Sequence, residues 1–168
     1  RGIVGEFLRK DIKILASNKG QANQGIIPRS ELNSKAKREL GLPDASFLVS
    51  RKFADELLAM PRNPNGKNNT EVIKPFLVGE DIIDRPKNRF LIDFTGLSER
   101  EAALFEAPYE ALFPVKLHRA EMNQPEALEK WWIPWNNRSR LREFLHNSDR
   151  YIATPRNSKH RIFVMVST

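Results

Sequence analysis

Apolar residues recur along the chain at two spacings, and each spacing predicts one kind of element. Positions three or four apart, such as Phe53, Leu57 and Leu58, are typical of a helix with one buried face, whereas short apolar runs between turn formers indicate strands. Helices are predicted at 30–41, 51–60, 98–122, 125–130 and 137–147. Strands are predicted at 11–17, 46–50, 71–82, 88–94, 151–153 and 162–166. Because the two kinds do not alternate regularly, the expected class is α+β, a single compact domain of mixed antiparallel strands and short helices.

Capping residues and prolines predict where the helices begin and end. Ser30 is the expected N-cap of the first helix. Ser98, followed three residues later by Glu101, predicts a capping box, in which each side chain accepts a hydrogen bond from the other residue's backbone N–H. Pro108 and Pro114 are expected to interrupt this later helix or to begin new pieces of it, because proline has no backbone N–H to donate.

Composition narrows the class of protein. Of the 168 residues, 40% are apolar and 29% are charged, which is typical of a globular chain long enough to bury a core. No apolar run approaches the length of a membrane span, so no membrane association is expected. Cysteine is absent, which excludes disulfides and thiolate zinc sites and agrees with a cytoplasmic location. The chain starts at Arg1 without an initiator Met, which indicates a segment of something larger.

Positive charge is concentrated near the end of the chain. The net charge is +7, and residues 136–168 hold +5 of it, with seven Lys or Arg against Glu143 and Asp149. A basic stretch of this kind favours polyanionic partners such as nucleic acid. Basic proteins without a nucleic-acid function are common, so charge alone does not decide between the two.

Residues that carry enzyme chemistry are mostly missing. The glycines are scattered singly, so no phosphate-cradling loop is predicted. His118, His146 and His160 lack metal-ligand spacing and are each expected to be a surface or helix-end histidine. No metal site and no catalytic residue is predicted in these 168 residues.

The carboxylates do not form a nuclease pattern either. The nearest approaches to a metal-dependent nuclease are the pairs Asp11 with Lys13 and Glu71 with Lys74, and neither has a well-placed upstream acid. Glu80 and Asp81 are adjacent in a predicted strand and would point to opposite faces. Asp93 is expected to pair with a nearby cation or to cap a turn. An autonomous nuclease therefore ranks third among the possible functions.

The basic residues near the end of the chain are the candidate DNA contacts. On the helix "NRSRLREFLHN", Arg138 and Arg142 share a face, Arg140 projects elsewhere, and the apolar residues Leu141, Phe144 and Leu145 are expected to point inward. On the hairpin "RYIATPRNSKHRIFVMV", alternation places the side chains of two cations on one face of the second strand while the histidine points away. The candidate DNA-binding residues are Arg138, Arg140, Arg142, Arg156, Lys159, His160 and Arg161, with Lys116 and Arg119 as a weaker pair on one helical face. The alternative is a solvated turn and helix edge.

Three tryptophans close together, Trp131, Trp132 and Trp135, allow two interpretations. Aromatic side chains can stack on bases, chiefly in single-stranded recognition. More often such a cluster belongs to the core, with at least one indole buried against a neighbouring helix. The core interpretation is the one we expect.

Several segments, read in order, resemble a known family. They are "NQGIIP", "SFLVSRKFADELL", "RNPNGKNNTEVIKPFLVGEDI", "RFLIDF", the "WW" pair and "RYIATPRNSKHRIF". In this order and spacing they are similar to the target-recognition domain of the MmeI-like Type IIG/IIL restriction-modification proteins, which are adenine-specific DNA methyltransferases often fused to an endonuclease. The resemblance covers roughly residues 20–168.

The resemblance implies a DNA-reading domain of a larger enzyme. It assigns residues 30–168 to a target-recognition domain that is incomplete at its C-terminus, and residues 1–29 to a segment leading from a catalytic domain. The family's S-adenosylmethionine loop and Asn-Pro-Pro-aromatic catalytic motif are absent, so the chain itself is expected to bind no cofactor and to catalyse no reaction. The implied partners are double-stranded DNA and the methyltransferase domain of the parent protein, which would use S-adenosylmethionine. The alternative is a protein-docking module of a restriction or defence complex, with the tryptophans as its hot spot.

Overall fold

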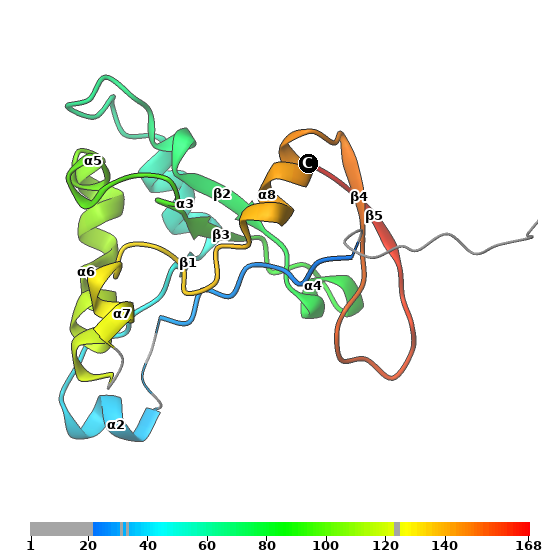
Figure 1. Cartoon of the computed structure of the whole chain (residues 1–168), viewed down its shortest axis with the longest axis horizontal. Helices are drawn as coiled ribbons and strands as arrows, with labels where there is room; N and C mark the ends of the chain where they lie inside the picture. Colours follow the sequence, from blue (N-terminus) through cyan, green and yellow to red (C-terminus); the bar gives the residue numbers. More distant parts are fainter. Residues whose placement is uncertain (1–21, 31, 33, 123–124) are drawn as a thin grey trace, which may run out of the picture.

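A three-stranded antiparallel sheet lies at the centre of the fold (Figure 1). The computed structural model describes residues 22–30, 32, 34–122 and 125–168. The strands are β1 (Leu48–Val49), β2 (Ile73–Phe76) and β3 (Arg89–Ile92), in the order β1–β3–β2. The predicted α+β class is confirmed, because helices and antiparallel strands are both present. The strand predicted at 11–17 lies outside the described residues.

Helices of different lengths surround the sheet. They are α2 (Ser34–Glu39), α3 (Arg51–Leu58), α4 (Gly79–Ile83), α5 (Glu99–Ala103), α6 (Glu106–Glu121), α7 (Pro125–Glu129) and α8 (Ser139–His146), with a 3₁₀ turn, η1, at Asn69–Glu71. Figure 1 shows α5, α6 and α7 together on one side of the molecule, and α4 and α8 on the other.

Aromatic side chains fill the core between the sheet and the long helix α6. The Phe94 ring lies 6.0 Å from that of Phe105, and Tyr109 meets Trp131 edge-on with ring centroids 5.1 Å apart. Edge-on and tilted ring pairs of this kind add stabilisation beyond the area that they bury. The core therefore unites β3, α6 and the segment after α7, although the sequence separates them widely.

Helix ends follow the predicted capping chemistry at Ser98 but not at Ser30. Ser98 Oγ and the backbone N–H of Ser98 both bond to Glu101 Oε2, at 2.7 and 2.8 Å, and the backbone N–H of Glu101 donates back to Ser98 Oγ at 3.3 Å, so the capping box is confirmed. Ser30 is not an N-cap, because α2 begins only at Ser34. Its hydroxyl instead donates to the carbonyl of Ala45 at 3.2 Å.

Two other predictions about helices were wrong. Residues 79–83 form α4 rather than part of a strand, because Asp81 Oδ2 accepts the backbone N–H of Val78 at 3.0 Å and so caps a helical turn. Pro114 does not interrupt α6, which continues through it to Glu121. Pro108 lies in the first turn of the same helix, where its missing N–H has no intrahelical partner to lose.

Apolar residues on two helices are less buried than predicted. Ala54 and Leu57 form the buried face of α3, while Phe53 is exposed. None of the residues of α8 is buried, and the predicted inward residue Phe144 is exposed. Helical spacing locates the element, but the neighbouring segments decide how deeply its apolar face is covered.

The predicted hairpin forms a second, separate sheet. Strand β4 (Arg150–Ala153) pairs antiparallel with β5 (Val164–Ser167), and Ile152 stands opposite Met165. The second strand begins later than predicted, so residues 154–163 form a long loop, here named the tip loop. Lys159 and Arg161 therefore do not alternate along a strand, and the prediction that they share a strand face was wrong.

Candidate nucleic-acid interface

The tip loop carries the exposed cations that the sequence singled out. Arg156, Lys159, His160 and Arg161 are all exposed, and within the described part of the chain none of them forms an ion pair. Residues 150–168 contain four Lys or Arg and no Asp or Glu, so the hairpin has no internal carboxylate to neutralise them. Its positive charge is directed to solvent.

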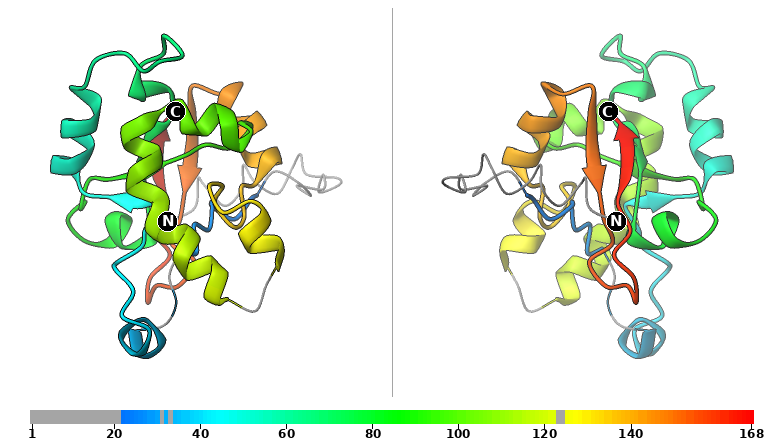
Figure 2. Two further views of the ribbon diagram at one scale, coloured as in Figure 1. Left: turned by 90° about the vertical axis from the view of Figure 1, so that its left-hand side faces the viewer. Right: turned by 90° about the vertical axis from the view of Figure 1, so that its right-hand side faces the viewer.

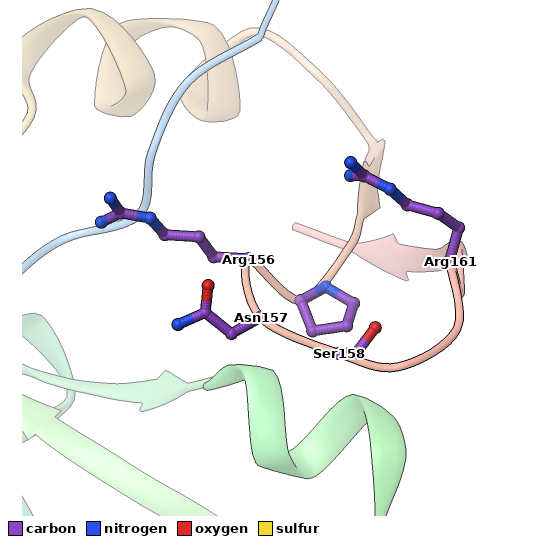
Figure 3. A pocket seen from close by; sticks show the side chains of 5 residues that line it. Arg156, Asn157, Ser158 and Arg161 are labelled. Atoms are coloured by element: carbon purple, nitrogen blue, oxygen red, sulfur yellow. The ribbon is translucent and has the colours of Figure 1, made fainter.

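A shallow open pocket lies within the tip loop. It has a volume of about 330 Å³ and is lined by Pro155, Arg156, Asn157, Ser158 and Arg161. Figure 3 shows Arg156 and Arg161 leaving opposite limbs of the loop, with Asn157 and Ser158 between them. Ser158 Oγ donates to the carbonyl of His160 across the turn. The two guanidinium groups and the amide provide donors suited to phosphate oxygens or base edges.

The root of the tip loop is held against α4. Pro155 is buried, and a Cβ built on Gly79 would lie 3.3 Å from Pro155 Cβ, so the two backbones approach closely. Figures 1 and 3 both show α4 beside the tip loop. At the other end of the hairpin, the backbone N–H of Thr168 donates to the carbonyl of Asp149 at 3.0 Å. The loop that carries the cations is thus held against α4 at Pro155, and the opposite end of the ribbon is closed by the hydrogen bond between Thr168 and Asp149.

The three arginines at and in α8 have different surroundings: Arg138, at the N-cap, and Arg142 bond to other segments of the fold, whereas Arg140 faces solvent. Arg142 Nη1 lies 2.5 Å from Asp93 Oδ2, and Arg142 Nε donates to the carbonyl of Asn137 at 2.6 Å. The Asp93 side chain is only 7% exposed, so this ion pair docks α8 on the end of β3. Arg138 is in the left-handed region with φ 51° and donates to Gln24 Oε1 at 2.7 Å. Arg140 is exposed and has no ion-pair partner among the described residues.

Asp93 fulfils both predicted roles. It pairs with Arg142, and its other oxygen accepts the backbone N–H of Thr95 at 3.1 Å, which caps the turn after β3.

Arg119 is not on the surface, so the prediction that it faces DNA was wrong. Its residue is 1% exposed, and Nη1 donates to the carbonyls of Ala127, Lys130, Trp131 and Ile133 at 2.9–3.4 Å. Nη2 donates to the carbonyls of Pro28 and Arg29 at 3.4 and 3.3 Å. Burial lowers the pKa of Arg119 to about 10, still well above neutral pH, so the cation that these carbonyls hold is charged.

Lys116, the other member of that weaker pair, has a partner within the fold. Its Nζ lies 3.3 Å from Glu99 Oε1 and 5.1 Å from the centre of the Trp131 ring. The same Glu99 oxygen accepts the indole N–H of Trp131 at 2.8 Å and the hydroxyl of Tyr109 at 3.1 Å. The indole hydrogen bond, with the help of Lys116 and Tyr109, holds the pKa of Glu99 below its usual value. Lys116 thus belongs to a structural cluster on α6.

The core interpretation of the tryptophans is confirmed for two of the three. Trp131 is 1% exposed and Trp132 is 8% exposed, with the indole N–H of Trp132 donating to the carbonyl of Leu97 at 3.0 Å. Trp135 is partly exposed, and the guanidinium of Arg29 lies 4.9 Å from its ring centre.

His118 lies in the last turn of α6, one of the two places expected for it, but it is buried rather than at the surface. Its Nδ1 accepts the backbone N–H of Leu32 at 3.1 Å, so Nε2 carries the proton and donates to the carbonyl of Pro43 at 2.6 Å. His146 and His160 are exposed, as expected.

The sequence analysis missed a basic turn after α4. Arg85 is exposed there, while Lys87 and Arg89 both bond to Glu80 Oε2 at 3.0 Å. These hydrogen bonds hold the pKa of Glu80 below its usual value. Single cations in a short turn carry little signal in a sequence, and only the contact between Gly79 and Pro155 shows that α4 belongs beside the tip loop.

No protein-family model, curated protein or solved structure matches the chain. Across the described ranges, no group of three or more His, Asp or Glu side chains is placed to hold a metal ion. Within the same part of the chain, every helix is too short or too polar to cross a membrane.

Proposed function

We propose that this chain is the target-recognition domain of an adenine-specific DNA methyltransferase in a restriction-modification or phage-defence system, acting in the cytoplasm. The observation that carries the proposal is the tip loop, whose cations are exposed, unneutralised by carboxylates of the hairpin, and carried on a fixed root. The family-level part rests on the resemblance of residues 20–168 to the MmeI-like target-recognition domain.

In this proposal the chain grips the duplex while another domain performs the chemistry. A methyltransferase must flip its adenine out of the base stack, and the duplex has to be held in register while this happens. Phosphate contacts from Arg and Lys supply affinity and position, and contacts to base edges supply sequence preference. S-adenosylmethionine and the catalytic residues belong to the methyltransferase domain of the parent protein.

The structure narrows the set of residues proposed to touch DNA. Those that are exposed and have no ion-pair partner among the described residues are Arg140, Arg156, Lys159, His160 and Arg161. Arg138 and Arg142 position α8 through Gln24 and Asp93, and their side chains support the interface from behind. Lys116 and Arg119 serve the fold.

The alternative, a protein-docking module built on the tryptophans, is less well supported. Its expected hot spot needs indoles that a partner can reach, whereas Trp131 and Trp132 are buried. The tip loop has neither the apolar centre nor the low charge that is typical of the middle of a protein–protein interface.

Fluorescence anisotropy with duplex DNA across a salt series tests the proposal. Each phosphate contact contributes close to one unit to the slope of log affinity against log salt, so Lys159→Ala should lower the slope by roughly one unit. If Arg161 reads a guanine edge, Arg161→Ala should cost about 1–3 kcal/mol and relax the preference at one position.

Lys52→Ala, which removes an exposed lysine on α3, is the matched control and should leave the slope unchanged. The parent protein should be used in parallel with the 168-residue chain. The decisive variant replaces Arg156, Lys159 and Arg161 together by Ala. If it folds and its duplex affinity, salt slope and sequence preference are all unchanged, the proposal is contradicted.

A further inference from the structure

One face of the β4–β5 ribbon is apolar and open to solvent. Ile152, Phe163 and Met165 are 63%, 65% and 60% exposed, which makes them the most exposed large apolar side chains in the described part of the chain. Ile152 and Met165 are paired across the ribbon, and Phe163 is the last residue of the tip loop, directly before the first residue of β5. Contiguous exposed apolar surface of this kind usually marks a contact site.

The opposite face of the ribbon is the one that the rest of the protein covers. Tyr151, Ala153, Val164 and Val166 alternate with the exposed residues and are partly buried. Figure 2 (right) looks onto the ribbon, and no described element lies in front of it in this view. Core packing therefore explains one face of the ribbon and leaves the other unexplained.

Cations bracket the apolar residues on the open face. Arg150 lies on the same face of β4 as Ile152, and Arg161 lies in the tip loop, two residues before Phe163. With no Asp or Glu in residues 150–168, every fully charged side chain of the hairpin is a cation. A second copy of the hairpin would bring like charges together, so charge complementarity favours a polyanion as the occupant.

We propose, on the basis of the proposed function, that this open face lies in the minor groove of the bound duplex, with Phe163 inserted as a wedge between base steps. Reading the major groove requires hydrogen-bonding side chains, and the open face offers few of them between Arg150 and Arg161. Minor-groove proteins instead insert Phe, Ile or Met between base steps and bend the duplex. The tip-loop cations would hold the phosphates on either side.

Two measurements on Phe163→Ala test the wedge. The first is the bending of a duplex labelled at both ends, which is measured by energy transfer between the labels and should decrease. The second is the fluorescence of 2-aminopurine placed at the unstacked base step, which should no longer increase on binding. Affinity should fall by about fivefold or more, because stacking of an aromatic side chain on a base contributes roughly 1–3 kcal/mol. Netropsin, which occupies the minor groove, should compete with the unaltered protein.

Phe113→Ala is the control, since Phe113 is a half-exposed phenylalanine on α6 that contacts the Trp131 ring, and Figure 1 shows α6 on the other side of the molecule from the ribbon. If Phe163→Ala leaves the bending and 2-aminopurine signals unchanged while Lys159→Ala still lowers the salt slope, the wedge is overturned and the proposed function stands. If neither Phe163→Ala nor Lys159→Ala weakens DNA binding, both the wedge and the proposed function are contradicted. Sedimentation experiments test self-association. If the protein self-associates with rising concentration and Phe163→Ala abolishes this, the open face binds a second copy of the chain and the inference is overturned.

Discussion

Arg119 and the cations of the tip loop are the same chemical groups in opposite surroundings. The guanidinium of Arg119 is enclosed and donates to six carbonyls, while Arg156, Lys159 and Arg161 are exposed on a loop without a carboxylate. Burying a cation is costly unless hydrogen bonds compensate for the lost water, and both terminal nitrogens of Arg119 donate to carbonyls, so Arg119 is present for the fold. The fold gives the tip-loop cations no such task, and this difference is the reason for assigning them to a partner.

The largest effect on stability is expected in the aromatic core, where Trp132 is buried. Trp132→Ala should lower the free energy of unfolding by about 3–5 kcal/mol, as removal of a buried aromatic side chain does. Chemical denaturation followed by circular dichroism measures the change, with Trp132→Phe as a milder control that keeps most of the volume. A Trp132→Ala variant of unchanged stability that no longer binds DNA would instead place this indole on the DNA surface.

Replacing Arg119 should come next. Arg119→Leu removes the donors of six carbonyls, and buried acceptors left without partners cost about 1–3 kcal/mol each when water cannot reach them. Four of the six hydrogen bonds are only partly buried, so water can replace some of the lost donors and the expected loss is roughly 3 kcal/mol. Denaturation curves provide the value, and DNA affinity should be retained under conditions where the variant is folded. Weakened DNA binding by a folded Arg119→Leu variant would break the contrast between the two kinds of cation.

A smaller, pH-dependent effect is expected at Glu99. Its pKa is lowered from 4.5 in the folded protein, so the folded state binds fewer protons than the unfolded state at this site. The resulting stability is present above pH 4.5 and is lost as the pH falls through the lower folded value. Glu99→Gln should therefore lower the stability at pH 7, where the carboxylate is charged, and change it little near pH 3, so that the acid side of the stability curve becomes flatter. Equal acid sensitivity of the two proteins in thermal melts between pH 3 and 7 would exclude this role.

The smallest effect on stability is expected where the effect on DNA binding should be largest. Replacing Arg156, Lys159 and Arg161 together by Ala should change the free energy of unfolding by no more than about 0.5 kcal/mol, because the side chains are exposed and have no ion-pair partner among the described residues. The same denaturation experiment checks it. A loss of several kcal/mol would mean that these residues support the fold after all, and would remove the reason for assigning them to a partner.

Local patterns predicted local structure well. The capping box at Ser98 and Glu101, the helix after Ser50 and the hairpin around Pro155 all depend on residues a few positions apart. The tip loop proved longer than the turn formers suggested, because Ile162 and Phe163 are apolar like a strand but are not paired. Short apolar runs fix the presence of a strand better than its first residue.

Features that depend on distant residues could not be predicted. His118 and Arg119 look like surface residues of a helix, yet their partners lie as far as 86 and 91 positions away. Residues 79–83 continue an apolar run that is typical of a strand, and only the hydrogen bonds of Asp81 to Val78 and Lys87 turn them into a helix and its following turn. For the candidate site, the sequence identified the tip-loop cations but neither their anchorage on Gly79 nor the open apolar face.

The carbonyl cradle of Arg119 also has a consequence for how fast the molecule opens. Its hydrogen bonds to the carbonyls of Pro28 and Arg29 join segments 91 and 90 positions apart, so these two bonds require a large loop to close before they can form. Interactions of this kind are usually absent from the folding transition state, and they then act on the rate of unfolding rather than on the rate of folding. Arg119 would then slow unfolding by keeping residues 28–29 and 127–133 together.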